Sequence, residues 1–130
     1  MVARKLIASG EFDVIQCCYN LINQHPYDPV RKAGLMFEAE EKRMGIVIMR
    51  PLTSGTFQKW FGQVFGEDMQ GRDQKQRTRQ ALLAFVLSNP MVDSVLVGMR
   101  TAQEVVENVS VCENQKLRIA LDMLHERFVN

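Results

Sequence analysis

The sequence has no excess of charge of either sign and no long hydrophobic run. Its formal net charge is +1 over 130 residues, which gives no reason to expect nucleic acid or an anionic membrane as a partner. No apolar run approaches the ~20 residues that a membrane-spanning helix needs. The first residues also lack the apolar core and the cleavage site of a secretory signal. We therefore expect a cytoplasmic protein with no nucleic acid and no membrane as partners.

Cysteine is also scarce. The chain has 3 cysteines, Cys17, Cys18 and Cys112, and their spacing is not that of a metal site. Cys17 and Cys18 are adjacent in an expected strand, so their side chains would point to opposite faces. We expect all three to be small buried hydrophobic residues in a reducing compartment, and the sequence predicts no metal site.

What the chain does have is an ordinary globular composition, with 46% hydrophobic and 24% charged residues, in the length of one small domain. Helical and strand patterns alternate along it. Asp28 and Pro29 stand as N-cap and first residue of the second expected helix. The alternation favours a parallel sheet with right-handed crossovers, whose functional residues would follow the carboxyl ends of the strands. The expected strands cover residues 12–17, 45–49 and 95–97. The expected helices cover residues 2–9, 28–44, 74–87 and 101–112, followed by a last helix whose core stripe is Leu117, Ala120, Leu121, Leu124 and Phe128.

The segment over residues 94–109 carries the clearest functional signal. An apolar strand meets Gly98 and Arg100 and then the start of a helix, an arrangement that presents backbone N–H groups and a positive helix end to a phosphate. The Arg100 guanidinium would add a bidentate donor. Thr101 and Glu104 stand at the two positions of a capping box. Glu104 is therefore interpreted either as half of a helix cap or as a carboxylate that faces the ligand.

Three stretches of the chain resemble one enzyme family. FDVIQCCYNLINQ, GIVIMRPLTSG and ALLAFVLSNPMVDSVLVGMRTAQEVVENV are similar, in order and spacing, to the last three strand–helix units of an aldo-keto reductase. The resemblance implies an α/β fold that is a partial (β/α)8 TIM barrel, with about three parallel strands and outer helices, in a single unit over residues 1–130. It also implies NADP or NAD as the cofactor of a parent enzyme that reduces carbonyls by hydride transfer.

The resemblance implies cofactor-binding roles for residues that follow each strand. Glu104 stands where members that prefer NADPH often carry Arg or Gln, and a carboxylate there would repel a 2′-phosphate. The other implied roles are the nicotinamide carboxamide for Gln16, the nicotinamide ring for Met49, the pyrophosphate for Arg50, Pro51 and Leu52, the adenosine phosphate for Gly98, Met99 and Arg100, and the adenine for Glu107 and Asn108.

The family's catalytic Asp, Tyr, Lys and His lie on earlier strands, and no motif here replaces them. A complete barrel of this kind takes ~250 residues, so we expect this chain to be the carboxyl-terminal half, with the catalytic half absent and no activity alone. Tyr27 beside His25 is interpreted as a loop before a helix rather than a proton donor.

Two alternatives stay open beside this reading. The first is a non-catalytic module that binds a nucleotide through Arg50 and Arg100. The second is an oligomerising half-barrel with open strand edges at residues 12–17 and 94–98, which would pair with a second copy or with a missing amino-terminal half. An aromatic cluster at helical spacing could serve as its contact surface, although such spacing is more typical of core packing; its members are Phe57, Trp60, Phe61 and Phe65.

Overall fold

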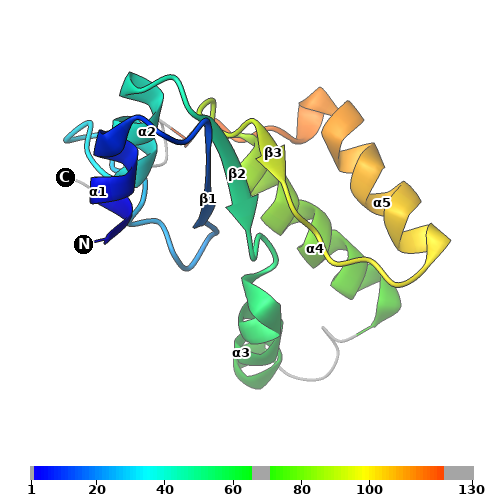
Figure 1. Cartoon of the computed structure of the whole chain (residues 1–130). Coiled ribbons are helices and arrows are strands. Elements are labelled where there is room, and N and C mark those ends of the chain that lie inside the picture. Colours follow the sequence, from blue (N-terminus) through cyan, green and yellow to red (C-terminus); the bar gives the residue numbers. More distant parts are fainter. Residues whose placement is uncertain (1, 66–70, 122–130) are drawn as a thin grey trace.

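The computed structural model describes residues 2–65 and 71–121, and its helices and strands alternate as the sequence indicates. Three strands form one parallel sheet in the order β1-β2-β3 (Figure 1). The α/β class and the parallel sheet are therefore confirmed. In chain order the elements are α1 (Val2–Ser9), β1 (Val14–Cys18), α2 (Leu35–Glu41), β2 (Gly45–Met49), the 3-10 turn η1 (Thr53–Gly55), α3 (Thr56–Phe65), α4 (Arg72–Leu87), β3 (Ser94–Val95), α5 (Ala102–Glu113) and the 3-10 turn η3 (Gln115–Leu117).

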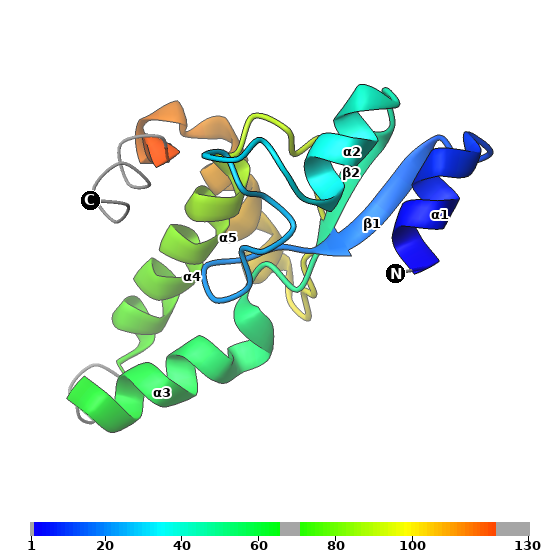
Figure 2. The same ribbon diagram turned by 90° about the vertical axis from the view of Figure 1, so that its left-hand side faces the viewer.

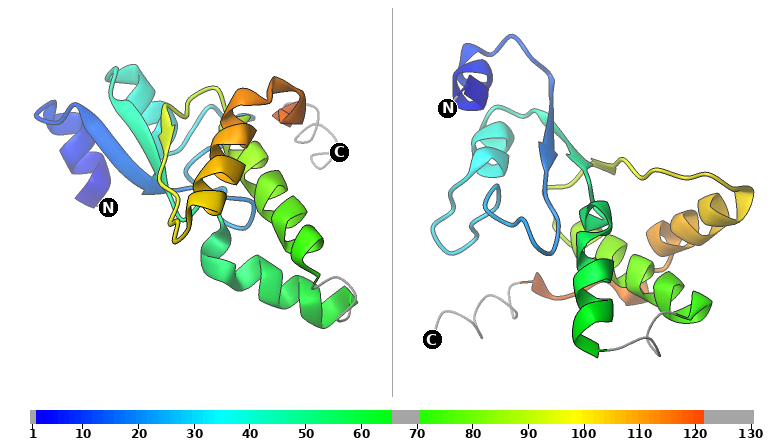
Figure 3. Two further views of the ribbon diagram at one scale, coloured as in Figure 1. Left: turned by 90° about the vertical axis from the view of Figure 1, so that its right-hand side faces the viewer. Right: turned by 90° about the horizontal axis from the view of Figure 1, so that it is seen from below.

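The two faces of the sheet differ in burial. In β2, Ile46 and Ile48 are fully buried, whereas the alternating residues Val47 and Met49 are only half-buried. Val14, which shares the second face, is 56% exposed. Residues of α2 and α4 share one core with Ile46 and Ile48, and α4 and α5 lie next to each other beside the strands (Figure 3). The sheet is thus open, with helices packed on one face.

The ends of β1 and β3 are set by the residues that can pair with β2. β1 begins at Val14, which pairs with Gly45, so Phe12 lies beyond the reach of β2 and outside the strand. β3 is limited to Ser94–Val95, although the N–H of Leu96 still donates to Ile48 O at 2.8 Å. Within the described chain, β1 and β3 each pair on one side only. The two open edges expected from the sequence are present.

One main core lies under the covered face. It joins Ile46 and Ile48 to helix residues and to aromatic rings, with Tyr19 stacked on Phe85 at 5.6 Å between ring centroids. Of the cysteines, Cys17 is buried within this core, but Cys18 is half-buried and Cys112 is exposed. The expectation of three buried thiols was therefore wrong for two of them. The buried members of the core are Ile7, Cys17, Tyr19, Tyr27, Met36, Ala39, Met44, Ile46, Ile48, Phe85, Val86 and Leu121.

The helix expected over residues 28–44 was wrong in its first part. Asp28 does make the cap-like contact, since its Oδ1 accepts from the N–H of Arg31 at 3.0 Å. However, Lys32 has a positive φ of 49°, and Ala33 pairs back with Asp28 through two backbone hydrogen bonds of 2.9 and 3.1 Å. The local Asp contact therefore closes a turn instead of starting a helix.

A glycine sets the true start of α2. Gly34 has φ 112°, and a Cβ at this position would lie 2.4 Å from the carbonyl oxygen of Pro26. The same oxygen accepts from the N–H of Met36 at 3.1 Å, which ties the start of α2 to the preceding loop. The helix ends at Glu41, shortly before Arg43 takes a positive φ of 55°.

At the β1 side of the sheet, α1 lies beside α2 (Figures 1 and 2). An ion pair links them, with Arg4 Nε 2.8 Å from Glu38 Oε1. Of the aromatic cluster, Trp60 is 54% exposed and its ring centroid is 6.1 Å from that of Phe57. Among the described residues, no helix is both long enough and apolar enough to cross a bilayer.

Candidate functional site

The loops that follow the three strands leave the sheet where the strands end. We call this side of the sheet the strand-end edge, to distinguish it from the unpaired edges of β1 and β3. Because the strands are parallel, their carboxyl ends lie together, and α3 begins just beyond them (Figure 1). Gln16 lies in β1 and Met49 ends β2, and the expected cofactor segments at residues 50–52 and 98–100 follow β2 and β3. Open parallel sheets bind ligands at this edge. It is therefore the candidate site.

Gln16 and Met49 are brought into contact. The Gln16 Nε2 atom lies 3.4 Å from Met49 Sδ, and both side chains belong to the uncovered face of the sheet. Gln16 is exposed and Met49 is half-buried. The amide of Gln16 is thus held by a weak acceptor on a surface that a ligand can reach.

The loop after β2 has an unusual backbone. Arg50, Thr53 and Ser54 have positive φ angles of 58°, 57° and 52°, and Gly55 follows at 77°. A left-handed non-glycine residue costs of order 1–3 kcal/mol and persists only where its surroundings enforce it. Such residues gather at ligand sites and switch regions, so three of them in six positions single out this loop.

Contacts on both sides hold the loop in place. Pro51 is buried and Leu52 packs against the smaller core cluster of Leu83, Ala84 and Val111. Thr53 Oγ1 accepts from the N–H of Phe57 at 3.1 Å, which anchors the loop to the first turn of α3. The Arg50 side chain, by contrast, is exposed, and its guanidinium has no hydrogen bond or ion pair within the described chain.

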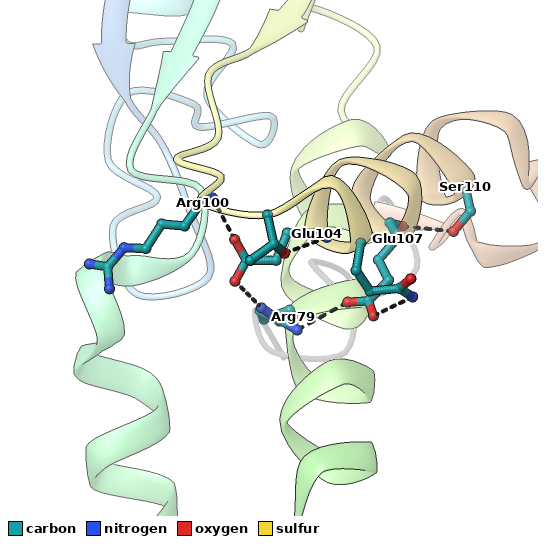
Figure 4. Close-up of polar contacts among 7 residues, drawn as sticks. Arg79, Arg100, Glu104, Glu107 and Ser110 are labelled. Carbon is teal, nitrogen blue, oxygen red and sulfur yellow. Dashed lines mark hydrogen bonds and ion pairs between the residues drawn. The ribbon is translucent and has the colours of Figure 1, made fainter.

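The segment after β3 is exposed along its length. Gly98 has no positive φ, and a Cβ there would meet no atom within 4 Å, so nothing in its surroundings demands a glycine. Met99 and Arg100 are exposed as well. The Arg100 guanidinium makes no ion pair with any described residue and points away from Glu104 and Arg79 (Figure 4).

The cap of α5 is confirmed, with one difference from the expected capping box. Thr101 Oγ1 accepts from the N–H of Glu104 at 3.2 Å. The Glu104 carboxylate reaches back to the N–H of Arg100, at 2.7 Å from Oε2. This contact, together with the Arg79 guanidinium, holds the pKa of Glu104 below its ordinary value. The helix-cap interpretation of Glu104 therefore has direct structural support.

Arg79, on α4, binds both carboxylates of the α5 segment (Figure 4). Its Nη1 lies 3.3 Å from Glu104 Oε1 and its Nη2 lies 3.1 Å from Glu107 Oε2. Glu107 also accepts from Gln103 Nε2 at 3.0 Å. The negative charge of both glutamates is thus met by donors within the chain.

Asn108 follows Glu107 on α5, but it has different surroundings from the ion-pair cluster. It is half-buried and lines a mostly apolar cavity of about 270 Å³ between α4, β3 and α5, which Val95, Val97 and Met99 also line. The expected adenine pair is therefore divided, since Glu107 belongs to the ion-pair cluster and Asn108 to the cavity.

The two tyrosines belong to the core. Tyr19 is fully buried, and burial raises the pKa of its hydroxyl to about 12, so that it stays protonated. The ring of Tyr27 is buried and stacks on Phe37 at 5.3 Å, while the neighbouring His25 is exposed. Neither hydroxyl is presented to a ligand at the strand ends, in line with the expected loop role of this segment.

The sequence places functional residues over 16–20 but assigns no role to Asn20, and it gives no indication of Arg79. Asn20, which is 4% exposed, links the β1 and β2 loops, and an Asn directly after a strand was its only sequence signal. Arg79 gave no sequence signal, because its partners Glu104 and Glu107 are 25 and 28 positions away. Among the described residues, no three His, Cys, Asp or Glu side chains gather as a metal ion would require. No protein-family model matches the chain, and no curated protein matches it either.

Proposed function

We propose that this chain is the dinucleotide-binding part of an aldo-keto-reductase-like barrel and holds NADP or NAD at the carboxyl ends of its strands. One observation carries the proposal. Arg50 and Arg100 follow neighbouring parallel strands, at the edge where such sheets bind ligands, and neither guanidinium has an ion-pair partner among the described residues.

Free guanidinium groups at this edge suit a pyrophosphate. Arginine forms bidentate, charge-assisted hydrogen bonds with phosphate oxygens. The two carboxylates on the helix that follows Arg100, Glu104 and Glu107, are already bound by Arg79. Their repulsion of an incoming anion is reduced accordingly, and the local field at Arg100 stays favourable to phosphate. The strained backbone of residues 50–55 at the same edge supports the same interpretation.

Calorimetric titration of the purified chain with NADP⁺, and separately with NAD⁺, tests the proposal. We expect weak, saturable binding that Arg100→Ala and Arg50→Ala each weaken about tenfold, which corresponds to ~1.4 kcal/mol. Lys42→Ala is the matched control, because it removes one positive charge next to the opposite end of β2 and should leave the affinity unchanged. Absence of binding, or equal binding by all variants, contradicts the proposal.

The proposed role does not include the chemistry. The resemblance assigns hydride transfer to the parent enzyme and the catalytic groups to strands that precede these. We therefore expect no turnover when the chain alone is mixed with NADPH and a generic aldehyde. The assay measures the loss of NADPH absorbance. Aldehyde reduction above the background rate would contradict the assignment of catalysis to the preceding strands.

A second candidate function is self-association through the open sheet. The observation that favours it is the exposure of large apolar side chains next to both edge strands. Phe12 and Val14 are exposed at the β1 edge, and Leu96 and Met99 at the β3 edge. Unpaired strand edges with apolar faces recruit further strands. Sedimentation velocity over a range of concentrations decides: a clean monomer at high concentration contradicts this candidate.

A further inference from the structure

Asn20 connects the loop after β1 to the loop after β2. Its Nδ2 donates to the carbonyl oxygen of Arg50 at 2.9 Å. Its Oδ1 accepts from the N–H groups of Ile22 and Asn23 at 3.0 and 2.9 Å. The side chain is buried and lies 30 positions before Arg50. One amide group therefore closes its own loop and binds its neighbour.

The bound carbonyl belongs to one of the left-handed non-glycine residues of the loop after β2. Arg50 has φ 58°, a conformation that costs a non-glycine residue of order 1–3 kcal/mol unless its surroundings fix it. Its carbonyl oxygen accepts twice, from Asn20 Nδ2 and from the N–H of Thr53 at 3.0 Å. These two donors come from different segments and hold the peptide in one orientation.

We propose that Asn20 is a positioning residue for the phosphate site: by holding the Arg50 carbonyl, it fixes the left-handed backbone that directs the Arg50 guanidinium to the strand-end edge. This inference rests on the proposed function for its ligand, a dinucleotide pyrophosphate. It rests on the structure alone for the link between Asn20 and the backbone of Arg50.

The two ends of the amide allow the positioning role to be separated from loop closure. Asn20→Asp keeps an oxygen that can accept from Ile22 and Asn23, but it replaces the donor to Arg50 by a second oxygen, which repels the carbonyl. Asn23→Asp is the matched control. Asn23 Nδ2 donates to the carbonyl of Cys18 at 3.0 Å, so this variant loses an equivalent hydrogen bond in the same loop without touching Arg50.

The first measurement is structural and needs no ligand. The Cα and Cβ chemical shifts of Arg50 in labelled protein report its backbone conformation. We expect left-handed values in the wild type and in Asn23→Asp, and a clear change in Asn20→Asp. Should Asn20→Asp fail to fold, Asn20→Ser replaces it, because a serine oxygen can still close the turn but cannot reach Arg50. Unchanged Arg50 shifts in the folded Asn20 variant overturn the inference.

The second measurement is binding of NADP⁺ by calorimetry. We expect Asn20→Asp to weaken binding about fivefold and Asn23→Asp to leave it within about twofold. In an Arg50→Ala background, Asn20→Asp should have no further effect, because contacts that act through one another are not additive. Equal losses in both backgrounds overturn the inference. If the wild type does not bind, the proposed function fails, while the Arg50 shifts still decide whether Asn20 positions Arg50.

Discussion

Arg79 is the residue that ties the start of α5 to the rest of the molecule. It is the one described cation within ion-pair distance of Glu104 and Glu107, and all three side chains are partly sheltered from solvent, Glu107 most of all at 12% exposure. Partly buried pairs are screened less than surface pairs. Removing Arg79 would leave two carboxylates close together without their shared partner.

Arg79→Ala should therefore lower the free energy of unfolding by about 1 kcal/mol, the upper end of what exposed ion pairs contribute. Urea unfolding followed by circular dichroism measures the loss. Arg77→Ala is the control, since this exposed arginine on the same helix has no ion pair in the described chain. Equal stability of the two variants would show that the cluster contributes nothing.

Glu104 predicts a pH dependence with a definite sign. Its pKa is lowered in the folded state, first by the Arg100 N–H and then by Arg79. The ionised form is thus favoured by folding, and its stabilisation is present above the ordinary pKa of a glutamate and is lost as the pH falls through the lowered value. The urea midpoint should drop more steeply on acidification for the wild type than for Glu104→Gln.

Asp28 provides the comparison for this titration. Its pKa is also lowered, by the N–H and the guanidinium of Arg31, so it contributes in the same acid range. Asp28→Asn should flatten the acid limb as well, and the double variant should flatten it further, because the two sites share no contact. An acid limb that neither substitution changes would contradict both assignments.

At this scale the sequence predicts what is local and misses what is not. The Thr101 cap could be predicted, because its partner lies three positions away on the same helix. The left-handed conformation of Arg50 could not, since the Asn20 side chain that binds its carbonyl comes from the loop after β1, 30 positions earlier. Arg79 was missed for the same reason: its two partners come from a different helix.

Among the elements, α2 shows how a tertiary contact overrides a local start signal. Asp28 and Pro29 have the residue types of a helix N-terminus, yet the chain turns back at Ala33 and the helix begins at Leu35. The reason is Gly34, whose backbone passes so close to the carbonyl of Pro26 that no side chain fits. The bounds of the strands, by contrast, were predicted to within two residues at each end.

Gly34→Ala should destabilise the protein by at least ~2 kcal/mol, since it adds a clash with Pro26 to the cost of a positive φ. Gly10→Ala is its matched control. Gly10 also has a positive φ, 72°, but a Cβ there would meet nothing within 4 Å, so we expect only the ~1–2 kcal/mol of the left-handed conformation. Thermal unfolding compares the two. Equal losses would mean that the close approach to Pro26 carries no energy.

For the whole molecule, the uncovered face of the sheet is the feature with the widest consequence. The alternation of strands and helices predicted a parallel sheet, and the structure has one, with one face left open. Whether that sheet continues into a barrel depends on segments that would pair with β1 and β3, and the residues of three strands alone do not determine this. The self-association candidate rests on the same face.

Val14→Lys combined with Leu96→Lys should suppress any self-association, because both side chains are exposed on the uncovered face. The thermal midpoint should change little, since neither side chain belongs to the core. Val30→Lys is the control, as Val30 is equally exposed but lies in the loop before α2. Sedimentation velocity provides the readout. Association that persists in the double variant would exclude the uncovered face as the surface through which the chain self-associates.

The central claim is that the strand-end edge binds a nicotinamide dinucleotide. A titration of labelled protein with NADP⁺, followed by amide chemical shifts, tests it most directly because it locates the ligand. We predict saturable shifts in residues 49–52 and 98–100, with smaller changes at the start of α5 and none in α1. Shifts confined to other regions, or no shifts at millimolar ligand, would contradict the claim.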